Sequence, residues 1–569
     1  MPIAAVSLKK RRSARAENKP ETVQRSLILP IITAEGIAMQ IIGRRIIITA
    51  AVIAIFGVGL MGRLFYIHLN RSFYLGYDVS VPRKVTVVCS YGDIYDRNGV
   101  KLVNRSEKYI AVINPKAVNR EVIEPHITDT EKYESCIDGD ALFLCGIDCD
   151  KIPSVTVIPV SQRYDNSLCT HIIGYIGENG GVCGLEGAYD DILRQPKSSV
   201  TLSYSVDAGG GLLEGQGVTM HWEDSFRTGI RTSIDYGMQS VCEKAMRNVE
   251  KGAAVVMDIS TGEICAVVSK PGYDPSRPEN SLDSDNSPFV NRAFSAYSVG
   301  SVFKLVTAGA ALEYGISDEY TYNCDGSITV NGQEFDCHRF GGHGELDMRK
   351  AIVESCNPYF ICLAQDIPTD FLHSFAERLC LGKENRLTAG ISSSSGYLTS
   401  YSELLVPAEK ANFAFGQGKL TATPLQITRM TAAIANGGQM PEPILVHGAS
   451  DSINGVQAAA APPRFTRVMK GSTADKLKSY MIDTVYKENS MAVPEFTTAG
   501  GKTSTAQTWT YDEYGNEKLN CWFTGFFPAD EPQYAVTVMI EEGISGNITC
   551  GPVFKEIADS VRMGRYGNN

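Results

Sequence analysis

The sequence lacks an excess of positive charge, and this absence limits its partners. Acidic residues outnumber basic ones by 64 to 53, for a formal net charge of −11. Neutralising nucleic-acid phosphates calls for a basic surface, so we expect no nucleic-acid partner. Two familiar zinc-binding patterns are also missing, because the 8 histidines form no H-E-x-x-H and the cysteines form no paired C-x-x-C. We therefore expect no metal and no cofactor.

No phosphate-binding loop is present either. The glycine-rich run Gly209-Gly210-Gly211 is not followed by the Lys-Ser/Thr pair that such a loop requires, so we expect a turn or linker there. A second candidate, Gly501-Lys502-Thr503, would need a glycine five residues before Gly501, where Phe496 stands. The sequence therefore excludes a Walker-type phosphate loop at these sites.

Cysteine, in contrast, is plentiful. All 15 cysteines follow the long apolar segment described below. Outside the cell they can form disulfides, whereas a reducing or anaerobic habitat leaves them as thiols. Cys324 and Cys337 are the first pair to test, because they bracket a polar stretch that predicts a hairpin with Asn331-Gly332 at its turn. Two unpaired thiols that pack as small apolar residues are an equally good interpretation.

Charged residues are absent from one long apolar stretch near the N-terminus, from Ile46 to Gly62. A helix of about 20 apolar residues crosses the hydrocarbon core of a membrane. Basic residues precede the stretch, and the positive-inside bias places them in the cytoplasm. We predict a basic cytoplasmic tail over residues 1–43, a single transmembrane anchor over residues 44–68, and the remainder outside the cell. The earlier stretch over residues 27–42 is interrupted by Pro30, Glu35 and Gly36 and predicts no second span.

The chain beyond the anchor is long enough for two further domains. Its 43% apolar and 21% charged residues are typical of globular proteins. Residues 69–227 alternate short β-branched runs with turn signals, which predicts an α+β domain without catalytic spacing. Residues 228–569 begin with a helical pattern and a hairpin pattern around Ser260-Thr261-Gly262. The predicted fold class is α+β, and the second domain carries the chemistry.

The first chemical pattern in that domain is Ser301-Val302-Phe303-Lys304, which opens an apolar run typical of a buried helix. Residues three apart share a helix face, so Lys304 can reach the Ser301 hydroxyl. A lysine serves as the base for a serine only if burial and nearby positive charge lower its pKa. Backbone N–H groups at the helix start can also stabilise an oxyanion. Alone, this four-residue pattern is weak evidence, because it recurs by chance.

Two more motifs follow Ser301–Lys304 along the chain, and the three together match a known set in their order. Ser355-Cys356-Asn357 precedes Pro358, an arrangement that also predicts a helix with Asn357 as its N-cap. Lys502-Thr503-Ser504-Thr505 lies in a threonine-rich run that predicts a β-strand. Together, S-x-x-K, an S-x-N-like triplet and K-T-G are the signature of penicillin-binding proteins and related β-lactamases.

On these motifs the sequence resembles class B penicillin-binding proteins over nearly everything after the anchor. Further segments agree with that family in order and spacing: residues 92–99 (GDIYDRNG), 184–190 (GLEGAYD), 415–418 (FGQG), 423–426 (TPLQ) and 522–526 (WFTGF). The resemblance implies an α+β pedestal domain over residues 69–227. It also implies a transpeptidase domain over residues 228–569, built on an antiparallel sheet with helices on both faces.

The resemblance implies a D,D-transpeptidase that crosslinks peptidoglycan stem peptides ending in D-Ala-D-Ala. In this family's mechanism Ser301 forms the acyl-enzyme with the penultimate D-alanine, and Lys304 is the base. Ser355 and Lys502 relay the proton to the departing D-alanine. β-Lactams such as penicillin inhibit such enzymes by acylating the same serine.

For substrate binding, the resemblance implies that Asn357 holds the substrate amide and that Thr503 and Thr505 face its carboxylate. The region between the anchor and the transpeptidase domain is too short for a glycosyltransferase domain. A separate membrane glycosyltransferase partner is therefore implied, in a bacterial cell membrane with the catalytic domain on the extracytoplasmic side.

Three residues depart from the family pattern. Ser504 replaces the glycine of K-T-G, Val299 replaces a proline, and Tyr91 replaces an arginine. A side chain at position 504 is expected to slow acylation, if substrate backbone approaches the strand there. Two alternatives stay open: a non-catalytic cell-wall assembly scaffold of the same fold, and a β-lactam sensor or hydrolase.

Overall fold

The computed structural model describes residues 32–69, 81–165, 168–207, 212–213, 217–224, 229–449 and 462–564. The chain divides into two compact units, Met1–Val79 and Ser80–Asn569, and each is described by itself. The first 31 residues of the predicted basic tail and the run Gly209-Gly210-Gly211 lie outside the described residues.

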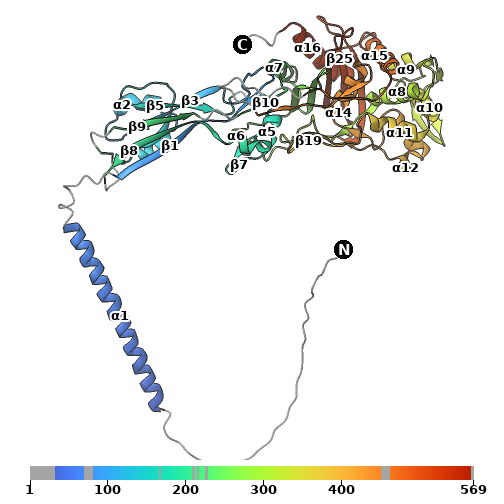
Figure 1. Ribbon diagram of the computed structural model, residues 1–569. Coiled ribbons are helices and arrows are strands. Elements are labelled where there is room, and N and C mark those ends of the chain that lie inside the picture. The colour runs from blue at the N-terminus through green and yellow to red at the C-terminus, as the bar shows by residue number, and fades with distance from the viewer. Residues whose placement is uncertain are drawn as a thin grey trace, which may run out of the picture. The chain divides into compact units, whose positions relative to one another are not determined.

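The first unit contains one long helix, α1, Ile32–Leu69 (Figure 1). Its stretch Ile42–His68 has a mean hydropathy of 2.1 and is long and apolar enough to cross a membrane. A single N-terminal apolar helix is therefore confirmed. The helix begins before the predicted anchor at residue 44, because a lone glycine such as Gly36 costs a helix only about 1 kcal/mol and does not end it.

The second unit begins with two antiparallel sheets that share a small apolar core. In sheet order their strands are β1 Val81–Tyr91, β8 Pro196–Val206 and β9 Thr219–Asp224, and then β4 Phe143–Ile147, β3 Ser106–Ile113 and β5 Thr156–Gln162. Side chains alternate along β3, so Val112 packs toward β1 and β8, whereas Ala111 and Ile113 pack against helix α3, Thr130–Cys136. The short elements of this region are α2 Arg120–Ile123, α4 Thr170–Ile173, β6 Ile176–Gly177, β7 Gly180–Gly181, α5 Gly184–Ala188 and α6 Asp190–Leu193.

Two of the family-like segments in this region hold buried ion pairs. Glu186, in the GLEGAYD segment, accepts hydrogen bonds from Arg163 Nε and Nη2 at 2.8 and 2.7 Å. Asp93, in the GDIYDRNG segment, is fully buried and pairs with Lys197 and with Asn104 Nδ2, the latter at 2.8 Å. A buried carboxylate is tolerated only when it is paired in this way, so these segments maintain the fold.

The centre of the following domain is a five-stranded antiparallel sheet. Its strands are, in sheet order, β12 Ile264–Lys270, β11 Gly252–Asp258, β26 Tyr534–Glu541, β25 Glu517–Phe527 and β24 Gly500–Tyr511. Along β11, Val255 packs into one core and its neighbours Ala254 and Val256 into another, as expected for a sheet buried on both faces.

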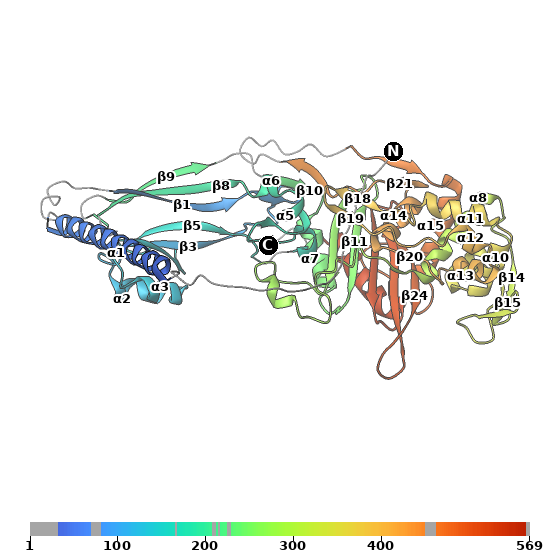
Figure 2. The same cartoon turned by 90° about the horizontal axis from the view of Figure 1, so that it is seen from below.

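Helices cover both faces of this sheet, as predicted (Figure 2). Helices α7 Tyr236–Ala245 and α16 Gly551–Arg562 lie on one face, and α8 Lys304–Tyr314, α14 Pro424–Ala435 and α15 Gly471–Val485 lie on the other. The remaining helices are α9 Met348–Glu354, α10 Asn357–Gln365, α11 Thr369–Arg378, α12 Tyr401–Leu404 and α13 Pro407–Ala414.

Small sheets complete the domain. They pair β13 Tyr297–Ser298 with β20 Thr421–Ala422, β14 Tyr322–Cys324 with β17 Gly344–Leu346, β15 Ser327–Val330 with β16 Gln333–Asp336, β18 Asn385–Thr388 with β19 Ile391–Ser393, and β21 Gln439–Pro441 with β23 Phe465–Arg467. The β15–β16 hairpin confirms the predicted turn, since Asn331 and Gly332 both have positive φ, 51° and 83°.

One three-stranded sheet joins residues from both sides of the predicted domain boundary at 227/228. Strand β10, Gly229–Thr232, pairs with β2, Asp93–Tyr95, and with β22, Val446–Ala449. This shared sheet explains why residues from Ser80 onward form one compact unit. The boundary itself stays a prediction.

Candidate active site

Ser301 and Lys304 lie at the start of α8. Residues Gly300–Phe303 form a 3-10 turn that continues into the helix, and in such a turn residues three apart lie almost directly above one another. Lys304 Nζ and Ser301 Oγ therefore lie within hydrogen-bonding distance, 2.9 Å apart. The FGQG segment supports the turn, because Gly300 N donates to Gly416 O at 2.8 Å. A Cβ at Gly416 would stand 2.1 Å from the Gly300 carbonyl oxygen, so only glycine fits there.

Ser355 and Asn357 reach the same amine from the junction of α9 and α10. Lys304 Nζ lies within hydrogen-bonding distance of Ser355 O at 2.5 Å, Ser355 Oγ at 3.2 Å and Asn357 Oδ1 at 2.6 Å. Ser355 has a left-handed φ of 58°, which costs a non-glycine residue about 1–3 kcal/mol and points to a constrained, functional position.

The predicted N-cap at Asn357 is wrong by one residue. Cys356 is the N-cap and Asn357 is the first residue of α10. The Asn357 side chain does not cap the helix, because it accepts from Lys304 and donates through Nδ2 to Asp336 O at 3.2 Å. Its amide is therefore held in one orientation by two partners.

Lys502 approaches Ser355 from strand β24. Its Nζ donates to Ser355 Oγ at 3.0 Å and to Thr503 O at 2.9 Å. Ser355 Oγ thus lies within hydrogen-bonding distance of both lysine amines and can pass a proton between them. The structure brings together five of the seven residues singled out in the sequence.

The remaining two, Thr503 and Thr505, follow Lys502 along β24. Thr503 is half-buried and Thr505 is exposed, and the Thr505 hydroxyl accepts from Gly546 N at 3.2 Å. In the described part of the chain, neither side chain hydrogen bonds to the serine–lysine cluster. Strand β24 is an edge strand of the central sheet, and an edge strand offers backbone groups to an extended peptide.

Burial sets the charge of the two lysines. Both are fully buried, and burial lowers the pKa of Lys304 to about 7. For Lys502, burial and then repulsion from Lys304 hold the pKa well below its ordinary value. A neutral amine has two N–H donors and one lone pair. Ser355 O and Asn357 Oδ1 are obligate acceptors, so in the neutral form of Lys304 they can take both N–H groups and leave the lone pair for the hydroxyl of Ser301 at 2.9 Å.

Two of the departures from the family pattern touch each other. Ser504 is buried, and its Oγ donates to Val299 O at 2.8 Å. The Ser504 side chain therefore points into the protein beside the Ser301 turn, and a Cβ on Gly300 would stand 2.5 Å from its oxygen. The expectation that this side chain meets substrate at the strand edge is not supported by its position.

We expect Ser504→Gly to lose stability without gaining acylation rate. The variant loses a buried hydrogen bond and places a glycine in a strand, which together cost about 1–2 kcal/mol. Thermal unfolding and the rate of penicillin labelling are the two measurements, with Ser504→Ala as the control that keeps the Cβ. Faster labelling of Ser504→Gly than of wild type would show that the serine does obstruct the ligand.

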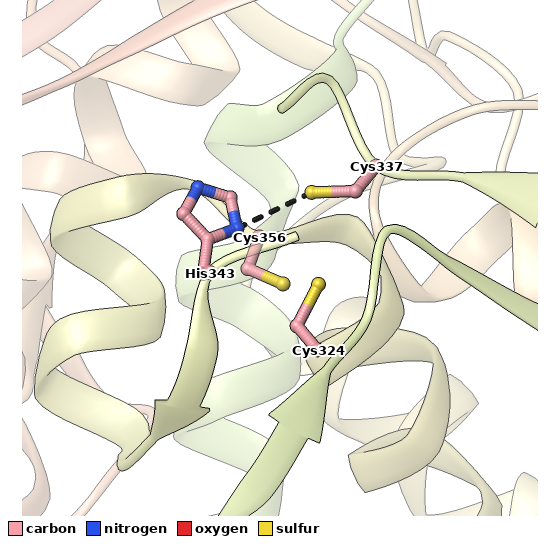
Figure 3. Close-up of side chains that lie close together, drawn as sticks. All are labelled: Cys324, Cys337, His343 and Cys356. Atoms are coloured by element: carbon pink, nitrogen blue, oxygen red, sulfur yellow. Dashed lines mark hydrogen bonds between the residues drawn. The ribbon is translucent and has the colours of Figure 1, made fainter. Parts of the chain in front are cut away.

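A group of potential metal ligands lies directly beside this site, and the sequence patterns did not reveal it. The ligand atoms of Cys324, Cys337, His343 and Cys356 all lie within 4.8 Å of one another (Figure 3). All fifteen cysteines are free thiols, so Cys324 and Cys337, proposed as the first disulfide to test, are not bonded to each other. Short-range spacing rules could not find the group, because its members come from four separate segments.

A half-buried serine beside a buried lysine of lowered pKa is the arrangement of an acyl-transfer enzyme. A family profile described as Penicillin binding protein transpeptidase domain matches residues 252–559, more than half of the chain. The chain belongs to the penicillin-binding protein transpeptidase family. Within it, the chain is a class B-like peptidoglycan D,D-transpeptidase.

Individual proteins that are similar to this chain support the same family assignment. The chain is 27% identical over 488 residues to Stage V sporulation protein D of Bacillus subtilis (strain 168), covering 79% of this chain and 74% of the relative. It is 28% identical over 537 residues to Peptidoglycan D,D-transpeptidase MrdA of Acinetobacter baumannii, covering 80% and 78%. A solved structure of penicillin-binding protein A from M. tuberculosis, a ceftriaxone acyl-enzyme complex, has the same fold, with a TM-score of 0.61 and 21% identity over 83% of this chain and 98% of that one.

Proposed function

We propose that Ser301 is the nucleophile of this D,D-transpeptidase and that Lys304 is its base. The observation that carries the proposal is the position of the Lys304 amine, 2.9 Å from Ser301 Oγ and within hydrogen-bonding distance of the acceptors Ser355 O and Asn357 Oδ1. Ser301 attacks the carbonyl carbon of the penultimate D-alanine, its proton passes to Lys304, and the terminal D-alanine leaves. A second stem peptide then accepts the acyl group.

The proton reaches the leaving group by way of Ser355 and Lys502. This role is supported by the position of Ser355 Oγ, 3.2 Å from Lys304 Nζ and 3.0 Å from Lys502 Nζ. Asn357 orients the substrate amide, and Thr503 and Thr505 receive its carboxylate along the edge of β24. Extended pairing along that edge suits a peptide substrate.

The remaining proposals concern the setting of the enzyme. The apolar stretch of α1 is a single-pass anchor in a bacterial cell membrane, with residues 69–227 as pedestal and residues 228–569 as an extracytoplasmic transpeptidase domain. Basic residues before the anchor support this orientation. A separate membrane glycosyltransferase supplies the glycan strands whose stem peptides are crosslinked.

The direct test is the site of covalent modification. Purified full-length protein, incubated with penicillin, is expected to gain the mass of one penicilloyl group, and peptide mapping is expected to place it on Ser301. The adduct should persist for many minutes, because a transpeptidase does not discharge it efficiently to water. Rapid release with strong β-lactam hydrolysis would instead identify a hydrolase, and the absence of any adduct would favour a scaffold.

Acylation is expected to rise with pH through an apparent pKa near 7. The neutral form of Lys304 is the active one, and burial lowers the pKa of Lys304 to about 7. Below that pH the rate should fall about tenfold per unit, and it should level off about one unit above. Stopped-flow acylation by a chromogenic β-lactam from pH 5 to 9 measures this, with the unfolding temperature recorded at each pH as the control. A flat profile would show that Lys304 does not titrate as the base.

A further inference from the structure

The β24–β25 hairpin carries an exposed tryptophan on the strand that borders the active site. In the middle of the hairpin, three residues of β24, 508–510, face a single residue of β25, Lys518. Such an irregularity is a β-bulge, which changes the direction of a side chain and is common beside active sites. Trp509, the middle residue of the bulge, is 67% exposed. The bulge therefore presents an indole to solvent.

The backbone conformation of Trp509 is unfavourable for its residue type. Its φ is 57°, and a left-handed φ is rare for a bulky residue because it brings Cβ close to a carbonyl oxygen. One carboxylate holds this conformation: Glu517 accepts from Trp509 N at 3.1 Å and from Gln507 Nε2 at 2.9 Å. An unfavourable conformation that neighbouring groups maintain points to a function of the exposed side chain.

The position of Trp509 on β24 relates it to the substrate. The turn that carries Ser301 lies against the same strand, since a Cβ on Gly300 would stand 3.0 Å from the Cβ of Ala506. Residues 500–502 of β24 are buried, whereas the end of the strand that holds Trp509 is exposed. A chain that is attached to Ser301 and pairs with the edge of β24 therefore extends toward Trp509, where the hairpin projects beyond the central sheet (Figure 2).

We propose that the indole of Trp509 binds a sugar ring of the peptidoglycan strand that carries the bound stem peptide. The inference rests on the proposed function. Trp509 lies four positions after Thr505, which is at most about 13 Å of extended strand. A stem peptide of about four residues spans that distance when extended, and the sugar that bears the stem comes next.

The chemistry beside Trp509 fits a saccharide better than a further length of peptide. One face of a pyranose ring carries C–H groups and packs flat on an indole, whose π face is weakly negative and attracts them. Polar groups suited to sugar hydroxyls stand nearby, on Thr508, Thr510 and Glu517. The bulge also interrupts the regular edge of β24, so a peptide cannot continue its pairing there.

Two donors that differ only in the sugar test this inference. Full-length protein in detergent receives either a synthetic stem peptide ending in D-Ala-D-Ala or the same peptide carried on the disaccharide repeat of peptidoglycan. The second-order rate constant of acylation is measured from single-turnover release of D-alanine. Wild type should prefer the disaccharide donor, and Trp509→Ala should reduce its rate constant for that donor by about three- to tenfold. Its rate constants for the free peptide and for penicillin should not change.

Two variants serve as controls. Tyr514→Ala removes another exposed aromatic ring, at the turn of the same hairpin, and should keep the preference for the disaccharide donor. Trp509→Gly should lose the preference while its unfolding temperature does not fall, because glycine accepts a left-handed φ without strain. A purely structural role of Trp509 predicts the reverse, a lower unfolding temperature with the preference retained.

Tryptophan fluorescence measures sugar binding without acylation. The chain has 3 tryptophans, of which Trp522 is fully buried and Trp222 lies on β9. In a variant with Trp222→Phe and Ser301→Ala, the remaining exposed indole is that of Trp509. The disaccharide donor is expected to protect this indole from quenching by acrylamide, and the free peptide is not. This measurement decides the question if neither donor acylates the protein.

Three results would overturn the sugar site: Trp509→Ala slows both donors equally, Trp509→Ala slows neither, or Trp509→Ala and Tyr514→Ala lose the preference alike. Absence of protection from acrylamide, with penicillin attached to Ser301, would overturn the sugar site and leave the proposed function intact. Protection by the disaccharide donor, with penicillin attached to another residue, would overturn the proposed function alone.

Discussion

Ser301→Ala is expected to abolish covalent labelling by a fluorescent penicillin, whereas Ser355→Ala should keep a slow residual reaction. The two hydroxyls have different environments. Ser301 Oγ lies 2.9 Å from the amine of Lys304, while Ser355 Oγ lies between the amines of Lys304 and Lys502. Without Ser301 the hydroxyl that forms the ester is gone. Without Ser355 the nucleophile and its base are intact and only the relay is lost.

Labelling is measured on a gel after denaturation, as a function of time. Ser295→Ala is a matched control, because this serine lies close to Ser301 in sequence and its hydroxyl donates to Asn291 O at 2.9 Å, away from the lysines. It should label like wild type. An undiminished label on Ser301→Ala, or a penicilloyl group mapped to Ser355, would show that the nucleophile has been assigned to the wrong residue.

Lys304→Met is expected to slow acylation by about 10²–10⁴-fold, the usual contribution of a general base. Methionine has a similar length and no charge, so it can occupy the buried position without a charged group to desolvate. It cannot take the proton of Ser301. Stability should fall as well, because Ser355 O and Asn357 Oδ1 each lose a donor, at about 1–3 kcal/mol for a buried unpaired acceptor.

A second buried lysine separates the loss of the base from the loss of stability. Lys410 on α13 is also buried, and its Nζ donates to Ile367 O at 2.8 Å. Lys410→Met should therefore reduce the unfolding temperature and leave the acylation rate close to that of wild type. If both variants acylate normally, Lys304 is not the base. If both are equally slow, the effect comes from a weakened fold.

The sequence predicted those parts of the site that depend on local geometry. Ser301 and Lys304 meet because they are three residues apart at a helix start, and the Asn331-Gly332 hairpin forms because both residues accept positive φ. The threonine-rich strand also formed as predicted. Family resemblance supplied the long-range part, the meeting of Lys502 with Ser355, which no spacing rule implies.

Other features depend on side-chain direction or on distant contacts and could not be predicted in this way. Ser504 lies on the strand face that points toward Val299, and the sequence does not say which face of a polar strand is buried. The expected absence of a metal rested on the spacing of nearby ligands, and it stays a prediction. Cys324 and Cys356, however, become neighbours only through the folding of the small strands around β14 and β17.

The edge position of β24 links ligand occupancy to the integrity of the fold. The central sheet ends at this strand, so a peptide that pairs with it serves as an additional strand for as long as it stays attached. Because such a guest binds the folded chain and not the unfolded one, mass action makes the loaded protein harder to unfold than the empty one. Covalent attachment through Ser301 would maintain this stabilisation for the lifetime of the ester. A β-lactam would then raise the resistance to unfolding of the protein that it inactivates.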